Sequence, residues 1–326
     1  MVARRVKKSV NVTKKTSVNK TRKIKHTSKT PFPIDIVYTW KGENKSKNER
    51  LSYNYELKYS LRSVFFNAPW VNKIFILMNK KAQPSWIKNN KKIIILDHND
   101  TFPSKKYLPN FNSNAIETTI ANIKGLSEHY IYFNDDIFIG RKSKYTDFFT
   151  PSGKAVIDGY IGKKTREILR DNNNNKLNIE FPPGYERVNK HVPIPQIKSL
   201  VLEFNKKYAD YIEWIRMTKK RKDRGFDVCE KYNLNSPCQQ VHLQIFNYIY
   251  SNNKAVLVDR NNKDDYEYLP NIDENFVEKL NEILSNKPFF FCINDVETNP
   301  EKRKKIPKIM LDFFNAYYPN KPDFEK

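Results

Sequence analysis

Two adjacent acidic residues follow an apolar run near the middle of the chain. The run is 129–133, and Asn134, Asp135 and Asp136 come directly after it. Neighbouring carboxylates repel each other unless a cation or a proton lies between them. A hard cation such as Mg²⁺ prefers one or two carboxylates together with the oxygens of substrate phosphates. The pattern predicts a site for Mg²⁺ or Mn²⁺, although a plain turn that satisfies backbone donors has the same sequence.

The position of this acidic pair depends on the strand that precedes it. Buried strands of parallel sheets read as continuous apolar runs, and ligands collect at their carboxyl ends. A second run, 289–293, also ends in an Asn-Asp pair, formed by Asn294 and Asp295. If both strand ends lie at one edge of a sheet they share a ligand, so Asp295 is a third candidate for the metal. Two unrelated turns would look the same in the sequence.

Strand and helix patterns alternate from Pro31 onwards. Apolar and β-branched runs predict strands at 34–40, 73–78, 92–96 and 129–133. Apolar residues at helical spacing predict helices at 57–65 and 112–123, and we expect a short helix at 84–87. This alternation is typical of an α/β fold with a mainly parallel sheet.

The helix expected after residue 111 has its own polar start. Asn114 and Glu117 have the spacing of a capping box. Asn112 and Ser113 precede them, where free backbone amides and the helix dipole favour an anion. Ordinary helix capping explains the same residues equally well.

Beyond Asp136 the chain contains more loops and then returns to helices. Helical patterns run through 196–215, 239–250, 274–284 and 306–317. We expect one catalytic domain over 31–326. A helical insertion at about 185–255 is expected on the side where an acceptor molecule would bind.

The formal charge of +23 is unevenly distributed. Residues 1–30 carry eleven Lys or Arg and no acidic residue, which leaves +12 for the other 296 residues. This composition predicts a disordered basic arm that contacts a polyanion or an anionic membrane, or that merely solubilises the chain. A nucleic-acid-binding protein is therefore a competing function.

Few features of the sequence indicate in which cellular compartment the protein resides. The three cysteines, Cys229, Cys238 and Cys292, contain no CxxC pair, so their spacing predicts neither a disulfide framework nor a zinc site. No apolar run has the length of a membrane span or the position of a signal peptide. We expect a cytoplasmic protein.

Motifs between residues 34 and 325 resemble those of the Stealth family of sugar-phosphate transferases. They are 34–40, 59–64, 68–71, 84–86, 97–98, 108–109, 111–117, 125–128, 130–136, 191–195, 290–295 and 322–325, in the order of the family. The resemblance implies a fold similar to that of GT-A glycosyltransferases. It also implies transfer of a hexose 1-phosphate from a nucleotide-diphosphate sugar to a hydroxyl of a glycan acceptor, which releases a nucleoside monophosphate and forms a phosphodiester.

Two segments depart from the family pattern. After Trp40 the chain continues 41–44, Lys-Gly-Glu-Asn, where the family usually has Val, Asn or Asp, and Gly. The stretch 235–240 lacks the Arg that the family usually carries, and a missing cation weakens charge stabilisation at a diphosphate. These departures leave open a catalytically degenerate, carbohydrate-binding member of the family.

The resemblance also implies roles for individual residues. His191 is the first candidate for general base, because imidazole titrates near neutral pH and its Pro-rich surroundings predict a loop; His98 is the second. His129 and His242 fall in regular elements and are expected to pack. The full expected site has metal ligands, donor-binding groups and further catalytic groups: Asp135, Asp136 and Asp295; Asn112, Ser113 and Asn134; His191, Asp35 and Arg62.

Overall fold

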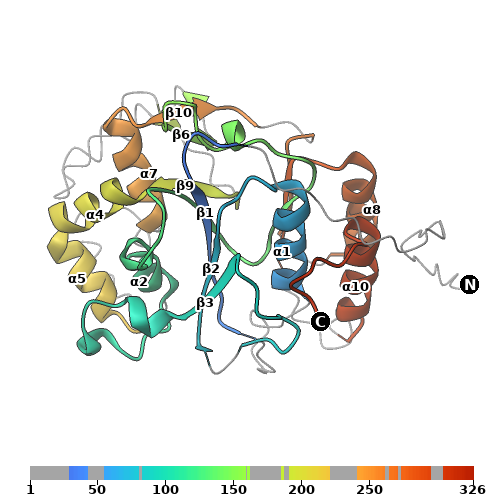
Figure 1. Ribbon diagram of the computed structural model, residues 1–326. Coiled ribbons are helices and arrows are strands. Elements are labelled where there is room, and N and C mark those ends of the chain that lie inside the picture. Colours follow the sequence, from blue (N-terminus) through green and yellow to red (C-terminus); the bar gives the residue numbers. More distant parts are fainter. Residues whose placement is uncertain are drawn as a thin grey trace, which may run out of the picture.

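Figure 1 shows the computed structural model, which describes most of the chain outside its first residues. The described residues are 29–42, 55–80, 83–158, 160–161, 185–186, 191–220, 241–260, 264–270, 273–294 and 304–326. Residues 1–28 of the expected basic arm, Asp295 and the stretch 235–240 lie outside them.

A five-stranded sheet forms the centre of the molecule. Its strands, in spatial order, are β3 (Ile93–Asp97), β2 (Ile74–Met78), β1 (Ile34–Thr39), β4 (His129–Phe133) and β9 (Ile194–Ile197). The first four are parallel to one another, and β9 is antiparallel to β4. Strands β1, β2 and β4 are almost entirely buried, as their apolar runs predict. The mainly parallel α/β fold expected from the sequence is confirmed.

Helices cover both faces of this sheet. Figure 1 shows α1 (Glu56–Asn67), α8 (Phe276–Asn286) and α10 (Ile306–Tyr317) on one side, and α2 (Ser113–Glu117), α4 (Lys198–Lys207), α5 (Ala209–Met217) and α7 (Val241–Ser251) on the other. Leu57, Leu61 and Val64 form the apolar stripe of α1 and are fully buried. No helix in the described part of the chain is long and apolar enough to cross a membrane.

A second sheet continues directly from the acidic loop. It has the order β11 (Tyr266–Leu269), β12 (Phe290–Ile293) and β5 (Ile137–Ile139), with β12 antiparallel to β5. Phe138 of β5 stacks on Phe291 of β12, with ring centroids 4.8 Å apart, and both rings are fully buried. This stacking fixes the position of the chain that follows Asp136.

Smaller elements complete the described structure. β6 (Ala155–Asp158) pairs with β10 (Ala255–Val258), and β7 (Tyr160–Ile161) pairs with β8 (Tyr185–Glu186). Short 3-10 helices are η3 (His98–Thr101), η4 (Lys105–Tyr107), η5 (Ile120–Asn122) and η6 (Tyr145–Asp147).

The segment 185–255 is not purely helical. The helix expected from Gln196 begins at Lys198, because Ile194–Ile197 pairs as β9 with the edge of β4. Pro195 lies in this strand opposite Ile131, which is acceptable because proline is tolerated in edge strands. The insertion therefore contributes a strand to the central sheet as well as helices.

Two local predictions were wrong. The N-cap of α2 is Asn112 and not Asn114, because the Asn112 side chain accepts a hydrogen bond from the Asn114 amide at 3.2 Å. Residues 84–87 form a turn that ends in a β-bridge between Ile87 and Glu325, and no helix forms there.

Candidate active site

The acidic loop lies beside the end of the first strand. Tyr38 of β1 is in register with Phe133 of β4, so the residues after both strands meet at the carboxyl edge of the sheet. There the Trp40 indole and Lys41 lie close enough to Asp135 to lower the pKa of its carboxyl group. Two neighbouring parallel strands thus place an indole and an ammonium group against the acidic pair.

His191 reaches the same edge because β9 runs in the opposite direction. Ile194, the first residue of β9, is opposite Tyr132 near the end of β4, so the chain just before β9 lies beside the acidic loop. The His191 Nδ1 atom is 3.6 Å from Asp136 Oδ2. Both side chains are partly exposed, so a substrate could reach them.

The second strand-Asn-Asp pattern lies against the first. Cys292 of β12 pairs with Ile137 of β5, and the Ile293 amide donates to the Asp136 carbonyl at 3.1 Å. The Cys292 thiol donates to Asp136 Oδ2 at 3.4 Å. Burial raises the pKa of this thiol well above its ordinary value, and the nearby Asp136 charge raises it further. The ends of β4 and β12 therefore meet, although β12 belongs to the three-stranded sheet and not to the sheet of β4. Asp295 lies outside the described residues and stays a prediction.

Tyr268 closes one side of the site. Its ring lies nearly parallel to the His191 ring, with centroids 6.2 Å apart and an interplanar angle of 20°. The Asn294 side-chain amide donates to the Tyr268 hydroxyl at 3.4 Å. Because Tyr268 is 39% exposed, it offers an aromatic surface at the edge of the site.

The acidic pair is electrostatically strained. Burial raises the pKa of Asp135 to about 7, and the charge of Asp136 adds to the rise; Lys41 and the Trp40 indole act in the opposite direction. The Asp136 Oδ1 atom is buried and has no hydrogen-bond partner among the described residues. A buried carboxylate oxygen without a donor is costly, and a divalent cation removes that cost.

The donor set fits a hard divalent cation. Asp135 and Asp136 supply carboxylate oxygens, which Mg²⁺ and Mn²⁺ prefer. A cation bound there would compensate the charge repulsion that raises the pKa of Asp135.

A buried network of hydrogen bonds lies next to the strand ends that carry the site. The His242 Nδ1 atom pairs with Glu117 Oε2 at 2.9 Å, and the Tyr132 hydroxyl donates to Glu117 Oε1 at 3.2 Å. Tyr132 also shares a hydrogen bond with Thr39 at 2.9 Å. His242 therefore packs as expected, and it also links α7 through Glu117 to the ends of β1 and β4.

Asp35 does not belong to this site. It is the second residue of β1, and Thr39 at the carboxyl end is four positions further along the strand, at roughly 3.3 Å per position. Its buried carboxylate accepts hydrogen bonds from the Asn72 side chain, the Lys73 amide and the Ser127 amide at 2.7–3.0 Å. Asp35 therefore fixes loops at the opposite edge of the sheet.

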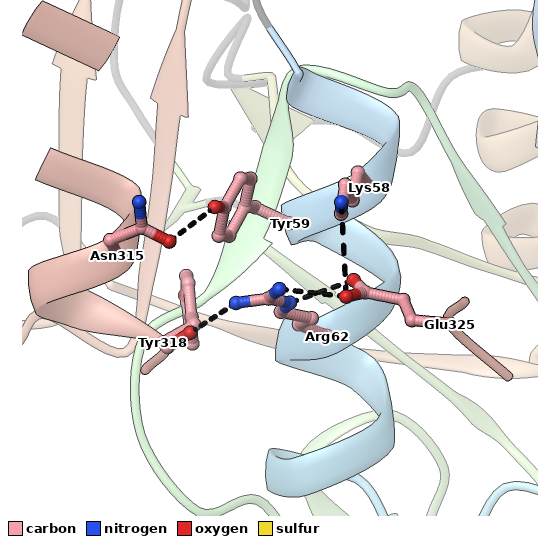
Figure 2. Close-up of polar contacts among 6 residues, drawn as sticks. All are labelled: Lys58, Tyr59, Arg62, Asn315, Tyr318 and Glu325. Carbon is pink, nitrogen blue, oxygen red and sulfur yellow. Dashed lines mark hydrogen bonds and ion pairs between the residues drawn. The ribbon is translucent and has the colours of Figure 1, made fainter. Parts of the chain in front are cut away.

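Arg62 is also elsewhere. Figure 2 shows its guanidinium group facing Glu325, with which it makes two hydrogen bonds of 2.7 Å, while a third of 2.7 Å goes to the Tyr318 carbonyl. The Arg62 side chain is only 3% exposed. These bonds satisfy the guanidinium inside the protein, so Arg62 joins α1 to the C-terminal segment instead of contacting a phosphate.

Of the remaining expected residues, Asn112 and His98 have other positions or partners, and Asn134 lies at the site. Asn112 caps α2 and donates to the Thr218 carbonyl, so its side chain is already used, and α2 has five residues, too few for a strong dipole. His98 follows β3, which lies three positions from β4 in the sheet, so it does not share the edge position of His191. Asn134 lies in the acidic loop, and Ser113 stays a prediction.

Four side chains of the site were not expected from the sequence. Lys41 was assigned only to a departing loop, while Trp40, Cys292 and Tyr268 had no assigned role. The sequence signals for them were position, since Trp40, Lys41 and Cys292 lie at or just after the carboxyl ends of apolar runs, and membership of the motifs 34–40 and 290–295 for Trp40 and Cys292.

The strain on Asp135 predicts a stabilising substitution. Its folded-state pKa of about 7 exceeds the ordinary value of 3.8, so the folded protein binds more protons between these pH values and loses stability as the pH rises through them. Without metal, Asp135→Asn should raise the free energy of unfolding near pH 7.5 by about 1–2 kcal/mol, after allowance for partial exposure. The gain should vanish near pH 4.

Urea unfolding of wild type and variant at both pH values, in EDTA, measures this difference. Asp100→Asn is the matched control, since Asp100 is exposed and lies in η3, away from the site. An equal gain at both pH values, or no gain at pH 7.5, contradicts the prediction.

Fold and site together define an α/β protein whose carboxyl sheet edge gathers carboxylates and a histidine. Two family models match the chain: "Stealth protein CR2, conserved region 2" over residues 50–157 and "Stealth protein CR4, conserved region 4" over residues 281–326. The chain belongs to the Stealth family.

Curated relatives of the chain carry the names of polysaccharide phosphotransferases. A capsular polysaccharide phosphotransferase of Haemophilus influenzae is 31% identical over 339 residues, which cover 89% of this chain and 85% of the relative. An exopolysaccharide phosphotransferase of Streptomyces coelicolor is 26% identical over 90% of this chain, which spans 57% of that relative's length. A second one from the same organism is matched over 53% of its length.

Two solved structures with a partial likeness to the fold are glycosyltransferases. The galactosyltransferase LgtC, in complex with donor and acceptor sugar analogues, has a TM-score of 0.40 at 12% identity, covering 89% of this chain and 98% of that chain. Mouse xyloside xylosyltransferase 1 has a TM-score of 0.38 at 10% identity, covering 81% and 98%.

Proposed function

We propose that the protein transfers a sugar 1-phosphate from a nucleotide-diphosphate sugar to a hydroxyl group of a glycan acceptor. The observation that carries this proposal is the meeting of Asp135, Asp136 and His191 at one sheet edge, in a chain of the Stealth family. Phosphoryl transfer needs charge neutralisation and positioning more than covalent chemistry, and these side chains offer both.

The acidic pair would hold the metal. Asp135 and Asp136 supply its oxygen ligands, and Mg²⁺ or Mn²⁺ bound there supplies positive charge for the diphosphate of the donor. Lys41 adds a second cation, since it acts electrostatically on Asp135 from the end of β1. It partly replaces the cation that the stretch 235–240 lacks.

His191 would take the proton of the acceptor. Asp136 lies beside Nδ1 and favours the tautomer that carries its proton there, which leaves Nε2 as the basic nitrogen. The acceptor oxygen then forms a bond to the sugar-bearing phosphorus, and the bond from that phosphorus to the bridging oxygen breaks. The hydroxyl proton passes to Nε2, and a nucleoside monophosphate leaves.

The products distinguish this reaction from glycosyl transfer. Attack at phosphorus yields a nucleoside monophosphate and a phosphodiester, whereas attack at the anomeric carbon yields a nucleoside diphosphate and a glycoside without phosphate. We expect the first pair when the protein is incubated with Mg²⁺, a panel of nucleotide-diphosphate sugars and glycan acceptors. Chromatography of the spent donor and phosphorus NMR of the glycan measure the outcome.

Two results would contradict the proposal. Release of a nucleoside diphosphate with a phosphate-free product would assign the chain to glycosyl transfer. Glycan binding without consumption of any donor would favour the degenerate, carbohydrate-binding alternative. Asp135→Asn, run in parallel, separates enzymatic turnover from spontaneous donor hydrolysis.

A further inference from the structure

Three side chains of different chemical type meet at the carboxyl edge of the sheet. A carboxylate oxygen of Asp136, Nδ1 or Nε2 of His191 and Sγ of Cys292 all lie within 4.8 Å of one another. The oxygen comes from the loop between β4 and β5, the nitrogen from the segment before β9, and the sulfur from β12. Oxygen, imidazole nitrogen and thiolate sulfur together suit a softer cation than Mg²⁺.

The distances match those of a tetrahedral site. With metal–ligand bonds of about 2.0–2.3 Å, the ligand atoms of a tetrahedral zinc site lie about 3.3–3.8 Å apart. Here Asp136 Oδ2 is 3.6 Å from His191 Nδ1 and 3.4 Å from Cys292 Sγ. Two of the three distances between ligand atoms therefore already fit a tetrahedral site, and the third, between His191 and Cys292, is at most 4.8 Å.

A separate observation points to a ligand at this position. The second carboxylate oxygen of Asp136, Oδ1, is buried and has no hydrogen-bond partner among the described residues. A native protein rarely leaves such an atom without a donor or a cation.

We propose that Asp136, His191 and Cys292 bind a thiophilic divalent cation, Zn²⁺ in particular, and that this ion inhibits the transferase. The inhibitory half rests on the function proposed above. On binding, the Cys292 S–H bond breaks, a sulfur–metal bond forms and the proton leaves to solvent. The three side chains leave a fourth position for water.

Inhibition follows from which side chains the ion holds. Asp136 would no longer be available to the Mg²⁺ of the reaction. The ion would also replace the carboxylate beside the His191 ring with a positive charge, which makes the ring a weaker base. Cys292 gives the selectivity, because Mg²⁺ does not compete for thiolate.

Binding is tested first, without any activity measurement. In the full chain with Cys229→Ser and Cys238→Ser, Cys292 is the only remaining cysteine of the three. Titration with Co²⁺, a spectroscopic substitute for Zn²⁺, should produce a thiolate-to-cobalt charge-transfer band that saturates at one equivalent. Zn²⁺ should abolish the band, and excess Mg²⁺ should not.

Variants identify the ligands. Adding Cys292→Ser or Cys292→Ala should remove the band, and His191→Ala or Asp136→Asn should weaken Co²⁺ binding by about 100-fold or more. His98→Ala is the matched control and should change nothing. Thermal melting of each variant confirms that it is folded. Absence of the band in the parent, or an unchanged band in His191→Ala and Asp136→Asn, overturns the site.

Inhibition is tested as a ratio within each protein. Initial rates with Mg²⁺ are measured with and without buffered Zn²⁺, and Cys292→Ser should need about 100-fold more free Zn²⁺ for half-inhibition than wild type. Equal sensitivity of both proteins overturns the inhibitory role. If no donor is consumed under any condition, the proposed function fails, and the cobalt titration still decides the metal site.

Discussion

Asp135→Asn and Asp136→Asn are each expected to lower the rate of sugar-phosphate transfer by about three orders of magnitude. A metal at a reacting phosphoryl group contributes several kcal/mol, and each 1.4 kcal/mol corresponds to about tenfold in rate. Either substitution removes one of the two carboxylates that meet the end of β1. Removal of metal from the wild type with EDTA should cause a similar loss, and added Mg²⁺ or Mn²⁺ should reverse it.

The same variants separate catalysis from folding. Asp135→Asn should be inactive yet more stable than the metal-free wild type, since it removes a buried carboxylate. Asp100→Asn, in the exposed segment η3, should keep both the rate and the stability of the wild type. Initial rates and urea unfolding on one preparation test this. Wild-type rates in both site variants, or full activity in EDTA, would remove the metal from the reaction.

Arg62→Met is expected to destabilise the protein by about 3–5 kcal/mol, because it leaves the Glu325 carboxylate buried without its guanidinium partner. The pair is almost completely buried, at 3% and 0% side-chain exposure. Lys58 lies 3.9 Å from the same carboxylate, as Figure 2 shows, and is too distant for a hydrogen bond. Urea unfolding measures the loss.

Two further variants test whether Arg62 has a structural role or a role in catalysis. Arg62→Met with Glu325→Met should recover much of the stability, since no buried charge remains. Once folded, this double variant should transfer sugar phosphate at close to the wild-type rate. Asp312→Ala, which breaks the exposed pair with Lys308, should cost less than about 0.5 kcal/mol. A stable Arg62→Met variant that has lost its activity would instead indicate that Arg62 binds a phosphate of the substrate.

The sequence by itself determined the four parallel strands of the central sheet and one of its loops. The apolar runs at β1, β2 and β4 predict buried strands, because strands covered on both faces tolerate continuous apolar sequence. The similar run at β3 forms the partly buried strand at the end of the sheet. Parallel direction then follows from the alternation with helices. Once strand direction is known, Asp135 and Asp136 must lie at the carboxyl edge, where ligands bind.

Strand polarity also explains why Asp35 was misplaced. The sequence marks both Asp35 and Asp135 as acidic residues next to apolar strands. In a parallel sheet, however, a residue that begins a strand and a residue that follows one lie at opposite edges. The position of each Asp relative to its strand end, more than its type, decides which one meets the site.

Only the tertiary structure decided the partners across long stretches of chain. Arg62 pairs with Glu325, 263 residues away, and Cys292 reaches Asp136 across 156 residues. His191 arrives because its segment adds an antiparallel strand at the edge of β4, where the sequence predicted only loop and helix. Such pairings depend on sheet order and side-chain packing over the whole domain. Local periodicity does not encode them, because it reports only which face of its own element a residue occupies.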